Sequence, residues 1–194
     1  MRPQNPFTWA SGWKSPIYCD NRITLSFPAV RTYIRQELCS AILANFDKPD
    51  VIAGVATGGV PQGVLVAQEL GIPFIYIRSA SKEHGMGNLI EGLYEEGQKV
   101  VVIEDLISTG GSSLKAVESL REAGLIVKGL ACIFTYGFSL AERNFEKAEC
   151  PYITLTDYSA LIEQALSDNY INEEDLVELR KWKENPAKWN SPVK

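Results

Sequence analysis

The chain has 194 residues, of which 45% are hydrophobic, so it is long enough to bury a sizeable core as one domain. Its formal net charge of -5 argues against a general nucleic-acid-binding or anionic-membrane surface, so any affinity for phosphate must be local. The four cysteines are scattered without a Cys-x-x-Cys pair and there is one histidine, a composition that disfavours zinc and favours reduced thiols in a cytosol.

Apolar segments at helical spacing alternate with short β-branched runs over most of the chain, and Gly or Pro marks many boundaries. This alternation predicts βαβ units, and therefore an α/β fold with a doubly wound, mainly parallel sheet flanked by helices. The predicted elements are, in order, a helix over about 30–46, a strand over 51–55, a helix over 60–70, a strand over 73–77, a strand that begins at 100, a helix over 112–123, a strand over 125–134, and helices over 139–149, 157–167 and 173–184.

The most informative segment is VVVIEDLISTGGSS, residues 100–113. Its β-branched residues predict a strand buried on both faces, and the Ser/Thr/Gly stretch from Ser108 predicts a strand-to-helix turn. Glycines let the backbone approach a ligand, and the amides and positive dipole end of the helix favour an oxyanion such as phosphate. Carboxylates at Glu104 and Asp105 accept hydrogen bonds from sugar hydroxyls or hold a hard cation. A phosphorylated sugar bound with Mg2+ fits both the Ser/Thr/Gly turn and the acidic pair.

Ligands bind outside the carboxyl ends of the strands in an open parallel sheet. We therefore expect three loops to converge: residues 56–59, the segment from Arg78, and residues 108–113. Taken alone, a Gly-rich turn is often only a tight βα connection, and an acidic pair is often a solvated helix N-cap. Their combination favours a ligand site. Hydroxyl donors for the phosphate are predicted at Ser108, Thr109, Ser112 and Ser113.

Three segments, in the expected order, carry a resemblance to a known family. VVVIEDLISTGGSS resembles the phosphoribosyl pyrophosphate (PRPP) signature of the type I phosphoribosyltransferases. FTWASGWKSPIYCDNR, residues 7–22, resembles the SG-x-x-SP-x-Y-x-D-x-R opening of the orotate phosphoribosyltransferases, and RSASKEHGMGNLIEG, residues 78–92, is similar to their mobile catalytic loop. The resemblance implies the type I phosphoribosyltransferase fold with a small N-terminal hood.

This resemblance implies transfer of the 5-phosphoribosyl group from PRPP to orotate, giving orotidine 5′-phosphate and pyrophosphate, in de novo pyrimidine (UMP) biosynthesis with Mg2+ as cofactor. Displacing pyrophosphate from ribose C1 builds positive charge on the sugar and negative charge on the leaving oxygens. Catalysis is then mostly positioning and electrostatic stabilisation, without a protein nucleophile. Two alternatives remain open: a phosphoribosyltransferase for another nucleobase, and a non-catalytic PRPP-sensing regulator.

The resemblance also assigns roles to individual residues. The implied catalytic residues are Lys82, His84 and Asp105. The implied PRPP-binding residues are Arg78, Lys82, His84, Glu104, Asp105, Leu106, Ile107, Ser108, Thr109, Gly110, Gly111 and Ser112. The implied pyrophosphate turn is Thr57, Gly58 and Gly59, and the implied orotate contacts are Ser11, Gly12, Ser108, Tyr136 and Gly137. No direct protein ligand is expected for the metal; Mg2+ is expected to bind mainly through PRPP oxygens and water, near Glu104 and Asp105.

The chain departs from the proteobacterial-type enzymes, mainly at cationic positions. It has Ala10, Gly58 and Ser79 where those enzymes have lysine, no arginine near residues 136–138, and Glu104 in place of the first aspartate of the signature. Each lost charge-assisted contact corresponds to ~1.5–3 kcal/mol, so the way in which an anionic base is held stays open. The substitutes that the sequence offers are the backbone amides at Ser11–Gly12 and Gly137 and the side chain of Lys14.

The polar stretch 79–98 is long for a connection in a compact domain, and such loops are usually lids or disordered segments. A lone Lys and His in a loop are more often solvated surface than catalytic groups. In the family, however, this loop closes over PRPP and contributes its Lys and His to the neighbouring subunit. The resemblance therefore implies a homodimer with active sites shared between the subunits.

We expect one domain over residues 1–194, with a hood of about 1–30 plus the C-terminal helices, a core of about 31–156 and a mobile loop of about 79–98. PRPP and orotate are the expected partners; nucleic acid and membranes are not. The first twenty residues lack the apolar core of a signal peptide, and no run approaches the ~18 apolar residues of a spanning helix. A cytoplasmic location is expected.

Overall fold

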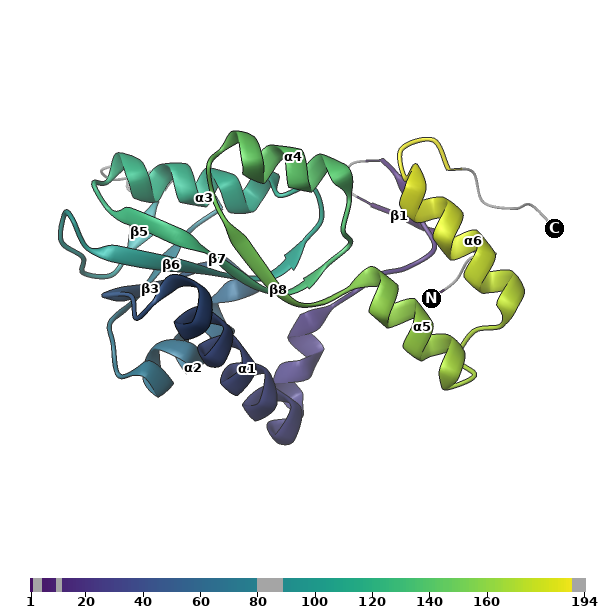
Figure 1. The fold of residues 1–194 in the computed structure, drawn as a ribbon, viewed down its shortest axis with the longest axis horizontal. Helices are drawn as coiled ribbons and strands as arrows, with labels where there is room; N and C mark the ends of the chain where they lie inside the picture. The colour runs from purple at the N-terminus through teal and green to yellow at the C-terminus, as the bar shows by residue number, and fades with distance from the viewer. Residues whose placement is uncertain (2–4, 10–11, 80–88, 190–194) are drawn as a thin grey trace.

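The computed structural model describes residues 1, 5–9, 12–79 and 89–189. A short hairpin and a 3-10 helix come first, and strands then alternate with helices (Figure 1). The strands are β1 (Phe7–Thr8), β2 (Lys14–Ser15), β3 (Val51–Val55), β4 (Phe74–Ile77), β5 (Ile90–Glu91), β6 (Lys99–Ile107), β7 (Ile126–Thr135) and β8 (Tyr152–Asp157). The helices are η1 (Asn21–Ser26), α1 (Pro28–Phe46), α2 (Gly59–Leu70), α3 (Gly111–Glu122), α4 (Ser139–Lys147), α5 (Tyr158–Ser167) and α6 (Glu173–Glu184).

The main sheet has the strand order β5-β4-β3-β6-β7-β8. Neighbouring strands are parallel except for the edge pair β4–β5, which is antiparallel. Residues 100–103 in the central strand β6 are fully buried, as the β-branched run predicts for a strand covered on both faces. The predicted α/β fold with a doubly wound, mainly parallel sheet is confirmed.

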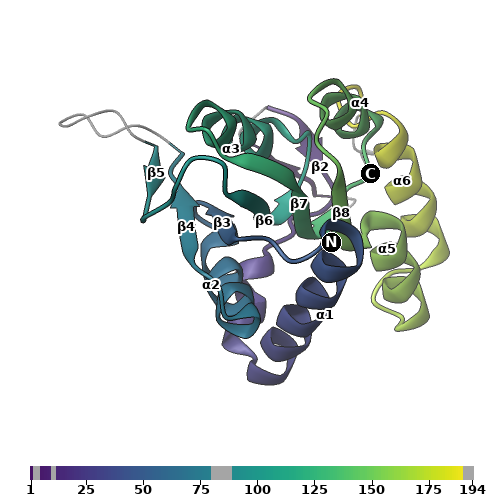
Figure 2. The ribbon, with the colours of Figure 1, turned by 60° about the vertical axis from the view of Figure 1, so that its left-hand side comes forward.

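Helices cover both faces of this sheet, with α1 and α2 on one side and α3 and α4 on the other (Figures 1 and 2). Successive residues of β6 pack on opposite faces of the sheet. Ile103 packs in the cluster that contains Leu38 of α1, and Val102 packs in the cluster that contains Leu120 of α3. The strand order reverses between β3 and β6, because β4 lies beyond β3 while β7 lies beyond β6. This reversal places a crevice at the carboxyl ends of β3 and β6.

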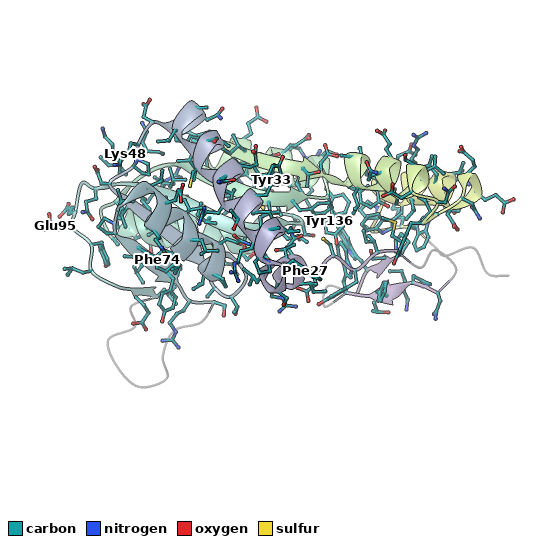
Figure 3. The ribbon with its side chains drawn as sticks, turned by 90° about the horizontal axis from the view of Figure 1, so that it is seen from below. Phe27, Tyr33, Lys48, Phe74, Glu95 and Tyr136 are labelled. Carbon is teal, nitrogen blue, oxygen red and sulfur yellow. The ribbon has the colours of Figure 1, made fainter. Side chains whose placement is uncertain are left out.

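The β1–β2 hairpin forms a small hood that packs against the C-terminal helices. Trp182 of α6 is fully buried, meets the ring of Trp9 edge-on at a centroid distance of 5.6 Å, and donates its Nε1–H to the backbone oxygen of Lys14 at 3.0 Å. Tyr136, just after β7, stacks on Phe138 in the same cluster, where the core meets the hood (Figure 3). Hood and C-terminal helices therefore share one aromatic core.

The structure contains five elements that the sequence patterns did not predict. β1, β2 and β5 have two residues each, too few for a periodic pattern, and β5 interrupts the stretch 79–98 that was expected to be loop. η1 has no buried residue, so it carries no apolar stripe. β8 is an edge strand without a fully buried side chain, which weakens the apolar signal of a strand. Within the described residues, no helix combines the length and apolarity that a membrane span requires.

Candidate active site

The loops at the carboxyl edge of the sheet surround a pocket of about 410 Å3, which we call the sheet-edge pocket. It brings together residues of the three segments expected to converge: Ala56 after β3, Arg78 after β4 and Ser112 at the start of α3. Lys115 adds a second cation that the sequence reasoning missed. The lining residues are Val55, Ala56, Ile77, Arg78, Ser79, Leu89, Gly111, Ser112, Lys115, Ala116 and Ser119.

The turn between β6 and α3 presents backbone amides at a helix start. Gly110 is the N-cap of α3 with φ +80°, and no side chain caps the first turn. A Cβ at Gly110 would overlap the ring of Phe145, so glycine is required there for packing as well as for conformation. Asn144 of α4 donates its side-chain amide to the backbone oxygen of Thr109 at 2.9 Å and so stabilises the turn. Uncapped amides at the positive end of a helix are suited to a phosphate group.

The two acids of the signature differ in environment. Glu104 is 5% exposed; its Oε1 accepts from the amide of Asp105 at 3.1 Å and its Oε2 accepts from the hydroxyl of Ser113 at 3.0 Å. Burial and the nearby charge of Asp105 raise the pKa of Glu104 to about 8. The prediction that Ser113 donates to the phosphate is wrong, because its buried hydroxyl turns toward Glu104. Asp105, only partly buried, is the more accessible acid.

The carboxylate of Asp105 lies directly against the turn 57–59. A Cβ at Gly58 would overlap this carboxylate, and a Cβ at Gly59 would overlap the backbone oxygen of Ile103. A lysine at position 58, as in the proteobacterial-type enzymes, therefore requires Asp105 to lie elsewhere. Asn21 of η1 donates its side-chain amide to the backbone oxygen of Asp105 at 2.6 Å. A residue from the N-terminal segment therefore also fixes the position of Asp105.

Arg78 lies at the base of the predicted catalytic loop and is held by β5. Its backbone N–H donates to the backbone oxygen of Leu89, next to β5, at 2.9 Å. Its Nη1 lies 3.5 Å from Oε1 of Glu91 in β5. Arg78 thus lines the sheet-edge pocket while its guanidinium is paired with Glu91. Lys82 and His84, predicted to act with it, lie outside the described residues, as does Ser11.

A second pocket, of about 260 Å3, lies between the hood and the end of β6, and we call it the hood pocket. Ser108 and Tyr136, two of the predicted orotate contacts, line it together with Leu106, whereas the side chain of Ile107 is fully buried. Burial keeps the pKa of Tyr136 well above its usual value, so its ring stays neutral. The complete lining is Thr8, Trp9, Tyr18, Cys19, Leu106, Ser108 and Tyr136.

Two of the amides proposed to hold an anionic base, those of Gly12 and Gly137, have acceptors within the chain, and the third, that of Ser11, lies outside the described residues. Gly12 donates to the backbone oxygen of Trp9 at 2.8 Å in the hairpin turn, and Gly137 donates to Oγ1 of Thr135 at 3.0 Å. Neither amide is directed at a ligand in this arrangement. The cationic alternative, Lys14, places its Nζ 2.7 Å from Oγ1 of Thr8.

Comparison with known proteins agrees with this geometry. The family model described as "Phosphoribosyl transferase domain" matches residues 28–165. The chain belongs to this family. Orotate phosphoribosyltransferase of Bacteroides fragilis is 54% identical over 98% of this chain and 90% of its own length, and that of Listeria monocytogenes is 56% identical over 97% and 90%. Among solved structures, orotate phosphoribosyltransferase from Aeropyrum pernix has a TM-score of 0.77 at 25% identity, covering 87% of this chain and 93% of its own.

Some site residues of this phosphoribosyltransferase family member were not found from its sequence. Asn21 and Tyr18 lie inside the hood motif, so the motif marked their segment but not their roles. Thr8 and Cys19 also lie in this segment, at positions that the motif does not specify. Asn144 carried no signal, because its bond to Thr109 joins segments far apart in the chain. Leu106, by contrast, was named from the signature and does line a pocket.

Proposed function

We propose that this protein transfers the 5-phosphoribosyl group from PRPP to orotate, forming orotidine 5′-phosphate and pyrophosphate, a step of de novo pyrimidine biosynthesis. The observation that carries the proposal is the position of the turn 108–112 between two unlike pockets. The sheet-edge pocket offers Arg78 and Lys115 to anionic groups, and the hood pocket offers neutral rings to a planar base. A sugar held at the turn reaches both. Relatives named orotate phosphoribosyltransferase are 54–56% identical to the chain over the aligned residues.

Each part of the site would then take one part of PRPP. The amides at the start of α3 and the hydroxyls of residues 108–112 hold the 5′-phosphate. Asp105 accepts hydrogen bonds from the ribose hydroxyls and favours the positive charge that develops on the ring, while Glu104 and its bond to Ser113 hold Asp105 in place. The turn 57–59 and Arg78 bind the departing pyrophosphate. Positioning and charge stabilisation account for the chemistry without a protein nucleophile.

Magnesium is the cofactor that we propose for this site. The ion would bind mainly through PRPP oxygens and water, near the carboxyl groups of Glu104 and Asp105, and without a direct protein ligand. Within the described residues, no three His, Cys, Asp or Glu side chains gather into one cluster. When bound through PRPP oxygens, the ion would neutralise charge on the pyrophosphate.

We also propose a homodimer in which Lys82 and His84 of one subunit complete the site of the other. Large apolar side chains exposed on η1 and the start of α1 support such an interface: Ile23 is 60%, Phe27 57% and Tyr33 63% exposed. Figure 3 shows Phe27 and Tyr33 on the outer side of this region. Mixing Lys82→Ala subunits with Asp105→Ala subunits tests the arrangement, because sharing predicts recovered activity in the hybrid, and no recovery contradicts it.

We also propose that residues 1–194 form a single domain and that the protein is cytoplasmic. The shared aromatic cluster of Trp9, Tyr136 and Trp182 supports the single domain, because it joins the hood, the sheet and the C-terminal helices. The free thiols of all four cysteines support a reducing compartment.

The direct test is pyrophosphate release from PRPP and Mg2+ in the presence of orotate, uracil or adenine. We expect release with orotate, a strong loss of kcat in Asp105→Asn, and little change in Asp168→Asn, a control at an exposed aspartate. Release with uracil or adenine but not with orotate would identify that base as the substrate instead of orotate. Binding of PRPP without release for any base would indicate a sensor and refute the proposal.

A further inference from the structure

The hood pocket poses an electrostatic problem for the proposed base. Orotate carries a carboxylate, and a carboxylate that leaves water needs a charged or strongly hydrogen-bonding partner. Among the described residues, the side chains that line the pocket are aromatic, aliphatic or neutral polar groups, and none of them is charged. As shown above, the amides of Gly12 and Gly137 donate within the chain. A cation at the rim of the pocket would supply the partner that the described lining lacks.

Lys14 lies at that rim. In the β1–β2 hairpin, Thr8 pairs directly with Lys14, so their side chains emerge on the same face. Thr8 lines the hood pocket, and Nζ of Lys14 donates to Oγ1 of Thr8 at 2.7 Å. The bond uses one of the three donors of the ammonium group, which leaves two for a ligand.

The backbone of Lys14 is anchored as well. Its carbonyl oxygen accepts the Nε1–H of the fully buried Trp182 at 3.0 Å, so the position from which the side chain extends is fixed by the aromatic core. Lys183, the next residue of α6, also lies near this end of the sheet. Its Nζ donates to Oγ of Ser159 at 2.7 Å and lies beside Gly137, which is not among the residues lining the hood pocket.

We propose that Lys14 determines base specificity: its ammonium group binds the carboxylate of orotate at the rim of the hood pocket and selects orotate over uracil, which lacks that group. The inference rests on the proposed function and deepens it. It also gives the chain a cation for the base in place of the family lysine and arginine that it lacks.

The test compares wild type, Lys14→Met, Lys14→Arg, Lys183→Met and the surface control Lys181→Met in two measurements. The first is steady-state pyrophosphate release, with KM for orotate and for PRPP. The second is calorimetric binding of orotidine 5′-phosphate and of UMP, which differ by the carboxylate. Lys181 is exposed and paired with Glu178, away from the pocket, so its variant should match wild type.

We expect Lys14→Met to raise KM for orotate and weaken orotidine 5′-phosphate binding by about 10- to 100-fold, with KM for PRPP and UMP binding nearly unchanged, and Lys14→Arg to keep most of the affinity. Unchanged orotate affinity in Lys14→Met, an equal loss for UMP, or a loss that appears in Lys183→Met instead would overturn the inference while leaving the proposed function intact. A wild type that fails to consume orotate would overturn the proposed function, and this inference with it.

Discussion

The buried acid Glu104 makes the stability of the ligand-free protein depend on pH in a predictable direction. The folded state holds its carboxyl at 5% exposure and raises the pKa from 4.5 to about 8. Between these values the folded protein keeps a proton that the unfolded chain has released, so the unfolding free energy falls as pH rises. One pH unit corresponds to ~1.4 kcal/mol, and the whole interval to roughly 3–5 kcal/mol.

Glu104→Gln removes this titration while keeping the size of the side chain. We therefore expect the variant to gain stability relative to wild type as pH rises, by up to ~1.4 kcal/mol per pH unit between about 4.5 and 8. Urea unfolding at several values from pH 5 to 8.5 measures the difference, with the exposed Glu118→Gln on α3 as the control. Parallel curves for wild type and Glu104→Gln at every pH would refute the reasoning.

Three further predictions concern the supports of the site. Gly58→Ala should lower kcat about 100-fold in a folded protein, because its Cβ displaces the carboxylate of Asp105; wild-type kinetics would exclude that contact. Asn21→Ala should reduce unfolding free energy by about 1 kcal/mol and also lower kcat, since it removes the bond to the Asp105 carbonyl; a stability loss with intact kcat would limit Asn21 to packing. Asn172→Ala should cost about 1 kcal/mol in urea unfolding through the lost N-cap of α6, and equal loss in Asn185→Ala, which has no capping bond to lose, would contradict this.

The sequence predicted the parts of the site that depend on neighbouring residues. The strand, the acids and the Ser/Thr/Gly turn of residues 100–113 follow one another directly, and the structure has β6, the turn and α3 in that order. The alternation of strands and helices likewise predicted the parallel sheet, because βαβ units restrict how successive strands are placed.

Contacts between distant segments could not be predicted in this way. The bond from Asn21 to Asp105 joins residues 84 positions apart, and the bond from Trp182 to Lys14 joins residues 168 apart. The orientation of Ser113 depends on the angle at which α3 starts, which residue type alone does not set. The hood pocket arises from such contacts, so the part of its lining that comes from Thr8, Tyr18 and Cys19 emerged only from the fold.

The most direct test of the account is a crystal structure with PRPP and Mg2+. We expect the 5′-phosphate within hydrogen-bond distance of the amides of residues 109–112, the ribose hydroxyls at Asp105, and the pyrophosphate between the turn 57–59 and Arg78. A sugar phosphate bound at saturating concentration somewhere else, with the start of α3 left to water, would contradict the account.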